Sequence, residues 1–401
     1  MPPPPPVEEE LEPISAPGLN EFRFAATIVM RSNRERPADG VLRETLRGAQ
    51  SLDRRAGGFV SRAVFAYYRW LGWLSPSLSP DQKVAEAWRM QCDFDRGPSR
   101  IPEADLLRLA VPPWVRDHMD IVPAWVRAIQ REPVLWLRTQ PGDGPDVAAA
   151  LGDCEPLGIP GWDETIAYKG IKDLYKEPSF QDGLFEIQDL HSQAVGRLCA
   201  PAATETWWDA CAGEGGKLLH LSALMENKGL IWATDRSEGR LERLRQRASR
   251  AGVFNYRSAH WDGAVDAALK TRFDGVLVDA PCSNLGTWHR NPHARWTVQP
   301  SDITELREIQ INLLAKVAPQ VKPGGKLVYA VCTLTREETV DVVAKFNETV
   351  PGFTPLPVED PFAVVTEESA GRAPVLSSTH WLLPERRPAN GMFVALWRRD
   401  G

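Results

Sequence analysis

The sequence lacks the marks of a membrane or secreted protein. It has no run of about 18 uninterrupted apolar residues, the length that a membrane-spanning helix needs. Its first residues form neither a basic start nor an apolar signal core, because Met1 is followed by five prolines and then by acidic residues. We therefore expect a cytoplasmic protein without a membrane partner.

Cysteine is scarce and scattered. The 401 residues include six cysteines, with no close Cys-x-x-Cys pair and no cluster of histidines and cysteines at ligand spacing. This distribution excludes a disulfide framework and predicts no metal site. The thiols are expected to be reduced, and therefore available for chemistry.

Positive charge is not in excess either. The formal net charge is -6, whereas proteins that bind a phosphate backbone usually carry a basic surface. A role with nucleic acid would therefore depend on a confined basic groove, and binding should weaken steeply with salt. We expect a monomer.

Four regions follow one another along the chain. Residues 1–20 are rich in proline and glutamate, which predicts a disordered tail. Residues 21–130 show helical periodicity, and residues 131–185 combine a strand-like piece with turns and a short helix, as in a small α/β connector. Residues 186–401 alternate strand and helix patterns, which predicts an α/β fold with a doubly wound, mostly parallel, Rossmann-like sheet.

The helical region contains a dense aromatic run from Phe59 to Leu74. Aromatic side chains can stack on nucleic-acid bases. We favour a core helix that is buried on much of its surface, because apolar residues dominate the run.

Two cysteines each follow a predicted strand. Cys282 comes after residues 273–278, and Cys332 comes after residues 326–331. If these are neighbouring parallel strands, both sulfurs lie at the carboxyl edge of the sheet, where open α/β folds bind ligands. A cysteine after a strand is more often a small buried apolar residue, and we favour that structural interpretation for the remaining four. These are Cys92, Cys154, Cys199 and Cys211.

Aspartates at three successive predicted strand ends lie beside a glycine-rich loop. Asp209 opens this loop, Asp235 could accept the hydroxyls of a ribose, and Asp262 could contact an adenine amine. Each aspartate alone is more typical of a cap or a turn, and the loop matches no dinucleotide or phosphate-loop motif. Together they predict a nucleoside pocket. The candidate cofactor-binding residues are Asp209, Cys211, Ala212, Gly213, Glu214, Gly215, Gly216, Lys217, Asp235, Arg240, Asp262 and Asp279.

The region from residue 188 to 340 resembles the RsmB/Sun-type family of S-adenosylmethionine-dependent RNA cytosine-5 methyltransferases. The motifs that carry this resemblance are Asp279-Ala280-Pro281-Cys282-Ser283, continuing through Gly286-Thr287 to Arg290-Asn291-Pro292, and Pro323-Gly324-Gly325-Lys326-Leu327-Val328-Tyr329, leading to Cys332. The helical region, with Asp53-Arg54-Arg55 ahead of the aromatic run, is similar to the NusB-like RNA-binding domain of some members.

Several positions depart from the family pattern. Glu214 stands where the first loop usually has proline, and Val331 where threonine usually precedes the second cysteine. The acidic and asparagine run after that cysteine becomes Glu337-Glu338-Thr339, and Asp-Gly-Phe-Phe near the C-terminus becomes Asn390-Gly391-Met392-Phe393. These departures mark a divergent member and leave the RNA target open.

The resemblance implies a role for each residue of the predicted catalytic pocket. Cys332 would be the nucleophile that adds to cytosine C6, and Cys282 would serve the release of product. Asp279 would bind the edge of the cytosine, and Lys217 would reach into the same pocket. The implied cofactor is S-adenosyl-L-methionine.

Candidate RNA contacts are fewer. Arg290 matches a family position near the substrate backbone, and Arg138 is a second candidate. His289 and His293 lack a third ligand at suitable spacing, so we expect a polar loop rather than a metal site. The arginine-rich stretch 240–250 is interpreted first as a solvated helix face.

The predicted function is methylation of cytosine C5 in a structured RNA, with ribosomal RNA as the expected substrate. Two alternatives remain open: the same chemistry on transfer RNA, and a noncatalytic RNA-binding or ribosome assembly factor that keeps the fold. A small-molecule methyltransferase would not need two thiols on adjacent strands. An amino-group methyltransferase would carry an Asn/Asp-Pro-Pro-aromatic loop, where this chain has Asp279-Ala280-Pro281-Cys282.

Overall fold

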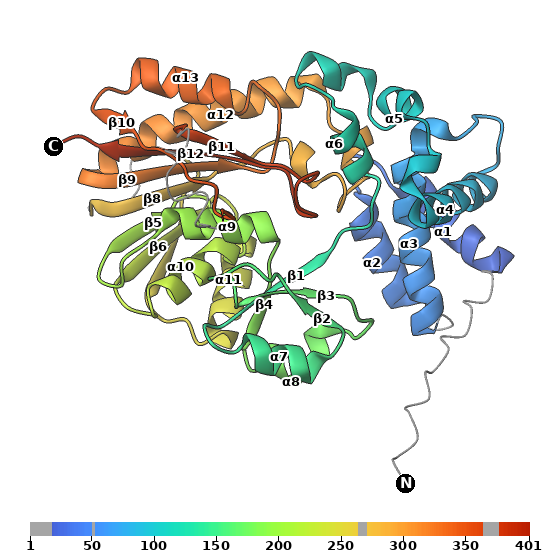
Figure 1. Ribbon diagram of the computed structural model, residues 1–401, viewed down its shortest axis with the longest axis horizontal. Coiled ribbons are helices and arrows are strands. Elements are labelled where there is room, and N and C mark those ends of the chain that lie inside the picture. Colours follow the sequence, from blue (N-terminus) through green and yellow to red (C-terminus); the bar gives the residue numbers. More distant parts are fainter. Residues whose placement is uncertain (1–17, 50–52, 264–270, 364–376) are drawn as a thin grey trace, which may run out of the picture. The chain divides into compact units, whose positions relative to one another are not determined.

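The computed structural model describes residues 18–49, 53–263, 271–363 and 377–401 (Figure 1). The chain divides into two compact units, residues 1–100 and 101–401. Of the predicted tail, residues 1–17 lie outside the described part. The predicted division into four regions stays a prediction, because these two units do not test its boundaries.

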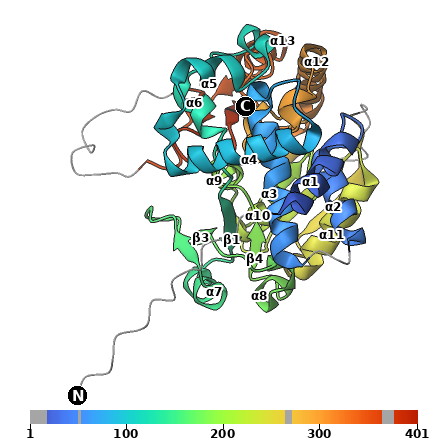
Figure 2. The same cartoon turned by 90° about the vertical axis from the view of Figure 1, so that its right-hand side faces the viewer.

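The first unit is helical, as the periodicity of its sequence predicts (Figure 2). Asp53 caps one helix through the backbone N–H of Ala56, and Ser79 forms a capping box with Gln82 at the start of another. The elements are α1 (Leu19–Arg31), α2 (Ala38–Gly48), α3 (Arg54–Trp70), η1 (Leu71–Trp73), α4 (Pro80–Arg96) and η2 (Pro98–Arg100).

The aromatic run of the first unit forms its core. Trp70 is fully buried, and its Nε1 donates a hydrogen bond to Gln91 Oε1 at 3.0 Å. The rings of Trp73 and Phe94 pack edge-on against Trp70. The interpretation of this run as a core helix is therefore confirmed.

The second unit begins with short helical segments and a small sheet. The helical segments are α5 (Glu103–Leu109), η3 (Pro113–Asp117) and α6 (Pro123–Ala128). The elements that follow are β1 (Leu135–Thr139), α7 (Gly144–Leu151), β2 (Cys154–Pro156), β3 (Thr165–Tyr168), η4 (Leu174–Lys176), α8 (Pro178–Gln181) and β4 (Phe185–Ile187).

The small sheet is antiparallel, with the strand order β2-β3-β1-β4, and forms a βαββαβ unit. Leu137 and Ile166 pack with Val147 of α7 on one of its faces. Trp136 on the opposite face belongs to the same apolar cluster as Leu190 of the following helix. The connector is therefore packed firmly onto the larger sheet domain.

The large sheet has the order β10-β12-β9-β8-β5-β6-β7, and β11 pairs with β12. Strands β5 to β9 are parallel, whereas β12 runs antiparallel to β9. Its strands are β5 (Thr206–Asp209), β6 (Leu230–Asp235), β7 (Tyr256–His260), β8 (Phe273–Asp279), β9 (Val321–Val331), β10 (Phe353–Pro355), β11 (Thr379–Leu382) and β12 (Met392–Arg399). The predicted mixed fold with a mostly parallel sheet is confirmed.

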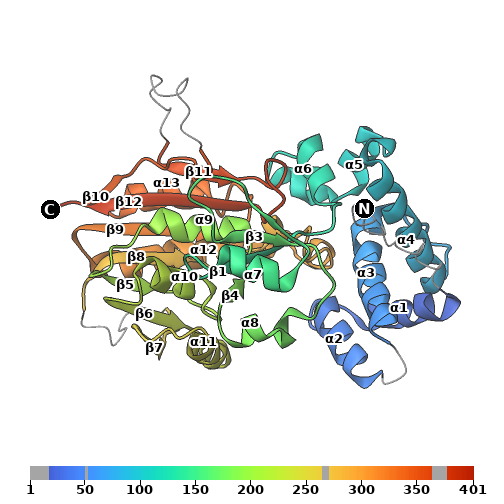
Figure 3. The ribbon, with the colours of Figure 1, turned by 60° about the horizontal axis from the view of Figure 1, so that its bottom comes forward.

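Helices cover both faces of this sheet (Figures 1 and 3). One apolar layer joins the strands to α9 (Leu190–Cys199), α10 (Gly216–Leu224) and α11 (Glu238–Arg250). The other joins them to α12 (Pro300–Val317) and α13 (Val340–Thr349). The strand order reverses between β5 and β8, and the carboxyl ends of strands at such a reversal form a ligand crevice.

In the part of the chain that the structure describes, no helix has the length and apolar character that spanning a membrane requires.

Candidate functional site

A pocket of about 600 Å³ lies at the carboxyl ends of β5, β6, β8 and β9. Both cysteines singled out from the sequence line this pocket, Cys282 after β8 and Cys332 directly after β9. The predicted cofactor residues that also line it are Asp209, Cys211, Ala212, Gly213, Glu214, Gly216, Lys217, Asp235, Arg240, Asp262 and Asp279.

The two thiols meet, as their strand positions predict. β8 and β9 are parallel neighbours with Asp279 opposite Ala330, so the turns that follow both strands leave the same edge of the sheet. The Sγ atoms of Cys282 and Cys332 lie 3.2 Å apart. The predicted pocket lined by two thiols is present.

The environments of the two thiols differ. Cys282 is buried, whereas Cys332 is half-buried at the pocket wall. The hydrogen bond with Cys332 raises the pKa of Cys282 well above its ordinary value, and burial and the negative charge of Glu338 add to the effect. The surroundings of Cys282 therefore favour its protonated form.

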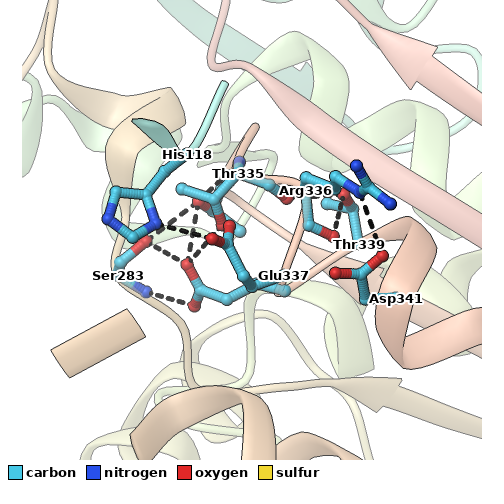
Figure 4. A network of polar contacts seen from close by, with 9 residues as sticks. His118, Ser283, Thr335, Arg336, Glu337, Thr339 and Asp341 are labelled. Carbon is cyan, nitrogen blue, oxygen red and sulfur yellow. Dashed lines mark hydrogen bonds and ion pairs between the residues drawn. The ribbon is translucent and has the colours of Figure 1, made fainter. Parts of the chain in front are cut away.

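A buried carboxylate joins the two loops that carry the cysteines. Glu338 is fully buried, and its Oε1 accepts hydrogen bonds from the backbone N–H of Ser283 at 2.8 Å and from Gln310 Nε2 at 3.1 Å. Its Oε2 accepts from the hydroxyls of Thr335 at 2.8 Å, Thr333 at 3.2 Å and Ser283. Ser283 and Thr335, which are labelled in Figure 4, are joined through this carboxylate.

Glu338 was not among the site residues predicted from the sequence, where the Glu337-Glu338-Thr339 run stands out only as a departure from a family pattern. A signal was present in the hydroxyl residues that follow each cysteine, because buried hydroxyls need an acceptor. Ser283 follows Cys282 directly, and Thr333 follows Cys332 directly.

A second set of contacts, made by His118, fixes the loop after Cys332. His118, after the η3 segment, has its Nδ1 2.7 Å from Glu337 Oε1, and its carbonyl accepts from the backbone N–H of Arg336 at 2.8 Å. Figure 4 shows His118 and Glu337 facing each other. Arg336 in turn bonds Asp341 at 3.2 Å. The loop after Cys332 is thus fixed on both sides.

Arg295 is a further structural residue that sequence reasoning missed. It is fully buried, and its guanidinium donates to the carbonyls of Ala110 and Ile129 and to Gln130 Oε1. Arg295 lies on the segment that follows Cys282, so the helical residues 110–130 are tied to that segment too. Buried guanidinium groups need such a set of acceptors, because an unpaired buried charge is costly.

Lys217 and Asp279 form an ion pair inside the pocket. Lys217 Nζ lies 2.6 Å from Asp279 Oδ2, and the lysine side chain is almost completely buried at the start of α10. Burial alone would lower the pKa of Lys217, but the charge of Asp279 and its hydrogen bond outweigh burial and raise it. Lys217 therefore stays positively charged in the pocket, and the carboxylate of Asp279 offsets part of this charge.

The glycine-rich loop is shaped by two left-handed residues. Gly213 has φ +55° and Gly215 has φ +86°. A Cβ on Gly215 would lie 2.8 Å from Leu244 Cγ, so Gly215 permits close packing of the loop against α11, while Gly213 faces open space. Asp235 Oδ2 accepts from the backbone N–H of Gly213 at 3.0 Å and Oδ1 from that of Ser237 at 2.8 Å.

Asp209 is an unusual carboxyl group at the base of the pocket. Burial raises its pKa to about 8, and the nearby charge of Asp279 adds to the rise. No side chain in the described part of the chain donates a hydrogen bond to its oxygens. A cationic ligand group would offset the cost of a buried carboxylate charge at Asp209. Burial also raises the pKa of the Cys211 thiol, which fits the structural role expected for it.

The arginines of α11 are largely engaged in ion pairs. Arg243 bonds Glu214 at 2.7 Å, and Arg247 bonds Glu186 of β4 at 2.8 Å. Arg250 contacts the same glutamate. The stretch is helical, as interpreted, but Arg247 and Arg250 are largely buried against Glu186, so this face is only partly solvated.

The candidate RNA contacts fare differently. Arg290 is exposed on the loop after Cys282. Arg138 is buried on β1, with its Nε donating to Gln188 Oε1 at 2.8 Å, and burial lowers its pKa to about 10. This interior position gives Arg138 no surface at which to meet an RNA backbone, so the structure speaks against that prediction. His289 and His293, on the same loop, are buried.

The second half of the chain matches a known family. The family described as 16S rRNA methyltransferase RsmB/F matches residues 197–398, about half of the chain. A probable ribosomal RNA small subunit methyltransferase B of Bacillus subtilis (strain 168) is 39% identical over 178 residues, 44% of this chain and 40% of the relative. The ribosomal RNA small subunit methyltransferase B of Shewanella oneidensis is 34% identical over 256 residues, 61% of this chain and 59% of the relative.

The chain thus spans about half the length of the curated relatives it matches. Among solved structures, the protein PH0851 superposes with a TM-score of 0.75 at 21% identity, covering 96% of this chain and 99% of that one. At this identity the likeness shows a shared fold. The parallel sheet with its helical N-terminal part is therefore found in a natural protein of nearly the same extent.

Proposed function

Because the chain belongs to the RsmB/F family of 16S rRNA methyltransferases, we propose that it methylates C5 of a cytidine in structured RNA, with ribosomal RNA as the substrate. Cys332 adds to C6 of the base and Cys282 serves product release. The observation that carries the proposal is the pair of thiols 3.2 Å apart in a pocket that also holds the aspartates of a nucleoside site.

The carboxylates and the glycine loop of the pocket suit S-adenosylmethionine. When bound, this cofactor supplies an electrophilic methyl group. Asp235, with its backbone partners, is placed to accept ribose hydroxyls, and Asp262 lines the same end of the pocket. Asp209 offers buried oxygens that an ammonium group would satisfy. The open space over Gly213 lets a ligand approach the backbone.

Attack by Cys332 activates the ring. The thiolate forms a bond to C6, and the electrons of the C5–C6 double bond move to C5, which becomes nucleophilic enough to take a methyl group. As the ring is attacked, N3 takes up a proton from solvent. Asp279 accepts hydrogen bonds from the cytosine amine and from this N3–H, while Lys217, 2.6 Å away, keeps Asp279 in place.

Release requires a base at the right moment. After methyl transfer the C5 proton leaves, the double bond reforms, and the bond between C6 and the sulfur of Cys332 breaks. The contact with Cys332 is the largest cause of the raised pKa of Cys282. Once Cys332 is bonded to carbon it no longer raises the pKa of Cys282 in this way. Cys282 then gives its own proton to solvent and, as a thiolate, takes the proton from C5.

The test uses labelled S-adenosylmethionine with ribosomal and transfer RNA as separate substrates. We expect Cys332→Ala to give no methylated RNA, because no adduct can form. Cys282→Ala should accumulate a covalent protein–RNA complex that is visible on a denaturing gel. Cys154→Ser, half-buried on β2 and not among the pocket residues, is the control.

Methylation by Cys332→Ala at the level of the unmodified protein would refute the mechanism. A protein that binds RNA but transfers no methyl group under any condition would favour the assembly-factor alternative. Methylation of transfer RNA in preference to ribosomal RNA would change the substrate and leave the chemistry in place.

A further inference from the structure

Asn284 lies between the two cysteine loops. It lines the pocket, its side chain is exposed to solvent, and its backbone has φ +60°. Glycine adopts this left-handed conformation most easily, and asparagine is among the residues that tolerate it. A side chain at this position therefore has to be explained by what its carboxamide does.

Both ends of that carboxamide bind within the catalytic loops. Nδ2 donates to the backbone carbonyl of Cys282 at 2.9 Å, and Oδ1 accepts from Cys332 Sγ at 3.0 Å. Cys282 Sγ lies 3.9 Å from the same oxygen. Because the bond from Nδ2 to the carbonyl fixes the direction of the amide, the group facing the Cys332 sulfur is an acceptor.

An acceptor at this place favours the thiol over the thiolate. The S–H of Cys332 donates to Oδ1, whereas a thiolate would lose this bond and face the negative end of the carbonyl dipole. We propose that Asn284 holds Cys332 as a protonated thiol in the free enzyme and so restrains the nucleophile. The relevance of this restraint for catalysis rests on the proposed role of Cys332, but the restraint itself does not.

Other charged groups face the same sulfur. Lys217 favours the thiolate, and Asp279, paired with it, offsets part of that charge. Glu338 lies beyond Cys282, and its charge acts on that thiol. The remaining charged groups of the pocket are Asp209, Glu214, Asp235, Arg236, Arg240, Arg247 and Asp262. All of these stay in place when Asn284 alone is changed, so they form a constant background.

Two substitutions with opposite expected effects test the proposal. Asn284→Gly removes the acceptor and relieves the left-handed backbone, so folding is preserved. Asn284→Asp keeps the shape, but offers a charged group that can only accept. Asn227→Asp is the control, because Asn227 is also a left-handed asparagine, with φ +56°, and it is half-buried and does not line this pocket.

The measurement is the rate of iodoacetamide alkylation of Cys332, resolved by peptide mass spectrometry, between about pH 6 and pH 10. At neutral pH we expect Asn284→Gly to react about threefold to tenfold faster, the range that one lost hydrogen bond allows. Asn284→Asp should react slower by at least about as much, with its profile displaced to higher pH. The control should match the unmodified protein.

Slower alkylation in Asn284→Gly would overturn the proposal, because it would show that the amide stabilises the thiolate. Equal rates in all variants would overturn it too. This assay needs neither RNA nor cofactor. If the proposed methylation were not found, the result of the alkylation assay would still stand. The role proposed for Asn284 and the proposed methylation can therefore be refuted separately.

Discussion

Replacing Glu338 by glutamine changes one oxygen into an amino group at the centre of the cysteine loops. Oε1 can keep its two donors, Ser283 N–H and Gln310 Nε2, if the new amide oxygen takes its place. The amino group then meets the hydroxyls of Ser283, Thr333 and Thr335, which now donate to a carboxylate oxygen. Hydrogen bonds to a charged group contribute about 1.5–3 kcal/mol each.

Some of these hydroxyls can turn and accept from the amino group, so the loss is smaller than three full bonds. We expect the local opening of the two loops to become easier by about 3 kcal/mol, equivalent to two lost charged bonds at the lower limit. Hydrogen exchange followed by mass spectrometry measures this opening directly. The Ser283 amide should exchange about 100-fold faster, since about 1.4 kcal/mol corresponds to a factor of ten.

The same variant should change the titration of a thiol. The charge of Glu338 is one of the causes that raise the pKa of Cys282, so its removal lowers that pKa and Cys282 is alkylated at lower pH. Glu337→Gln is the control, because Glu337 is half-exposed and contacts His118 on the outer side of the loop. Unchanged exchange at Ser283 in Glu338→Gln, or equal exchange in both variants, would refute the reasoning.

Two further predictions concern buried charges. The pKa of Asp209 is about 8 in the folded protein against an ordinary value of 3.8, so the folded state binds a proton that the unfolded state has lost, and its stability falls as pH rises through this window. Asp209→Asn should flatten the fall of the melting temperature between about pH 5 and pH 8. An unchanged slope would contradict this. Arg295→Met should destabilise the second unit by about 3–5 kcal/mol in urea denaturation, because buried acceptors lose their donor, whereas Arg336→Met at an exposed position should cost about 0.5 kcal/mol or less. Equal stability of these two variants would disprove the role of Arg295.

The meeting of Cys282 and Cys332 could be predicted from the sequence because it depends on strand order alone. Each thiol follows an apolar run of strand type, and parallel neighbours end at one edge. The start of β9 was not predicted, because the pattern suggested a strand from residue 326 while the strand begins at Val321. Gly324, with φ +77°, lies where the register of β9 against β8 shifts. Because Pro-Gly is a sequence typical of turns, the sequence pattern did not indicate an irregular strand start there.

The burial of Arg138 and Glu338 could not be predicted in the same way. Whether Arg138 faces solvent depends on the packing of β1 against α9, which lies about 50 residues further along the chain. Glu338 is buried because two segments that are distant in sequence, with Ser283 and Gln310, converge on its own loop. Neither arrangement leaves a local period in the sequence, and charged residues are exposed in most proteins.

The contacts of residues 110–130 also define where the chain can be divided. Removing everything before residue 131, the predicted border, would take away the acceptors of Arg295 and the partner of Glu337. Both loops that carry the thiols would then lose part of their support. A division at residue 101 keeps these contacts within one piece. The helices between residues 101 and 131 therefore support the thiol pocket, although their sequence pattern continues that of the helical region.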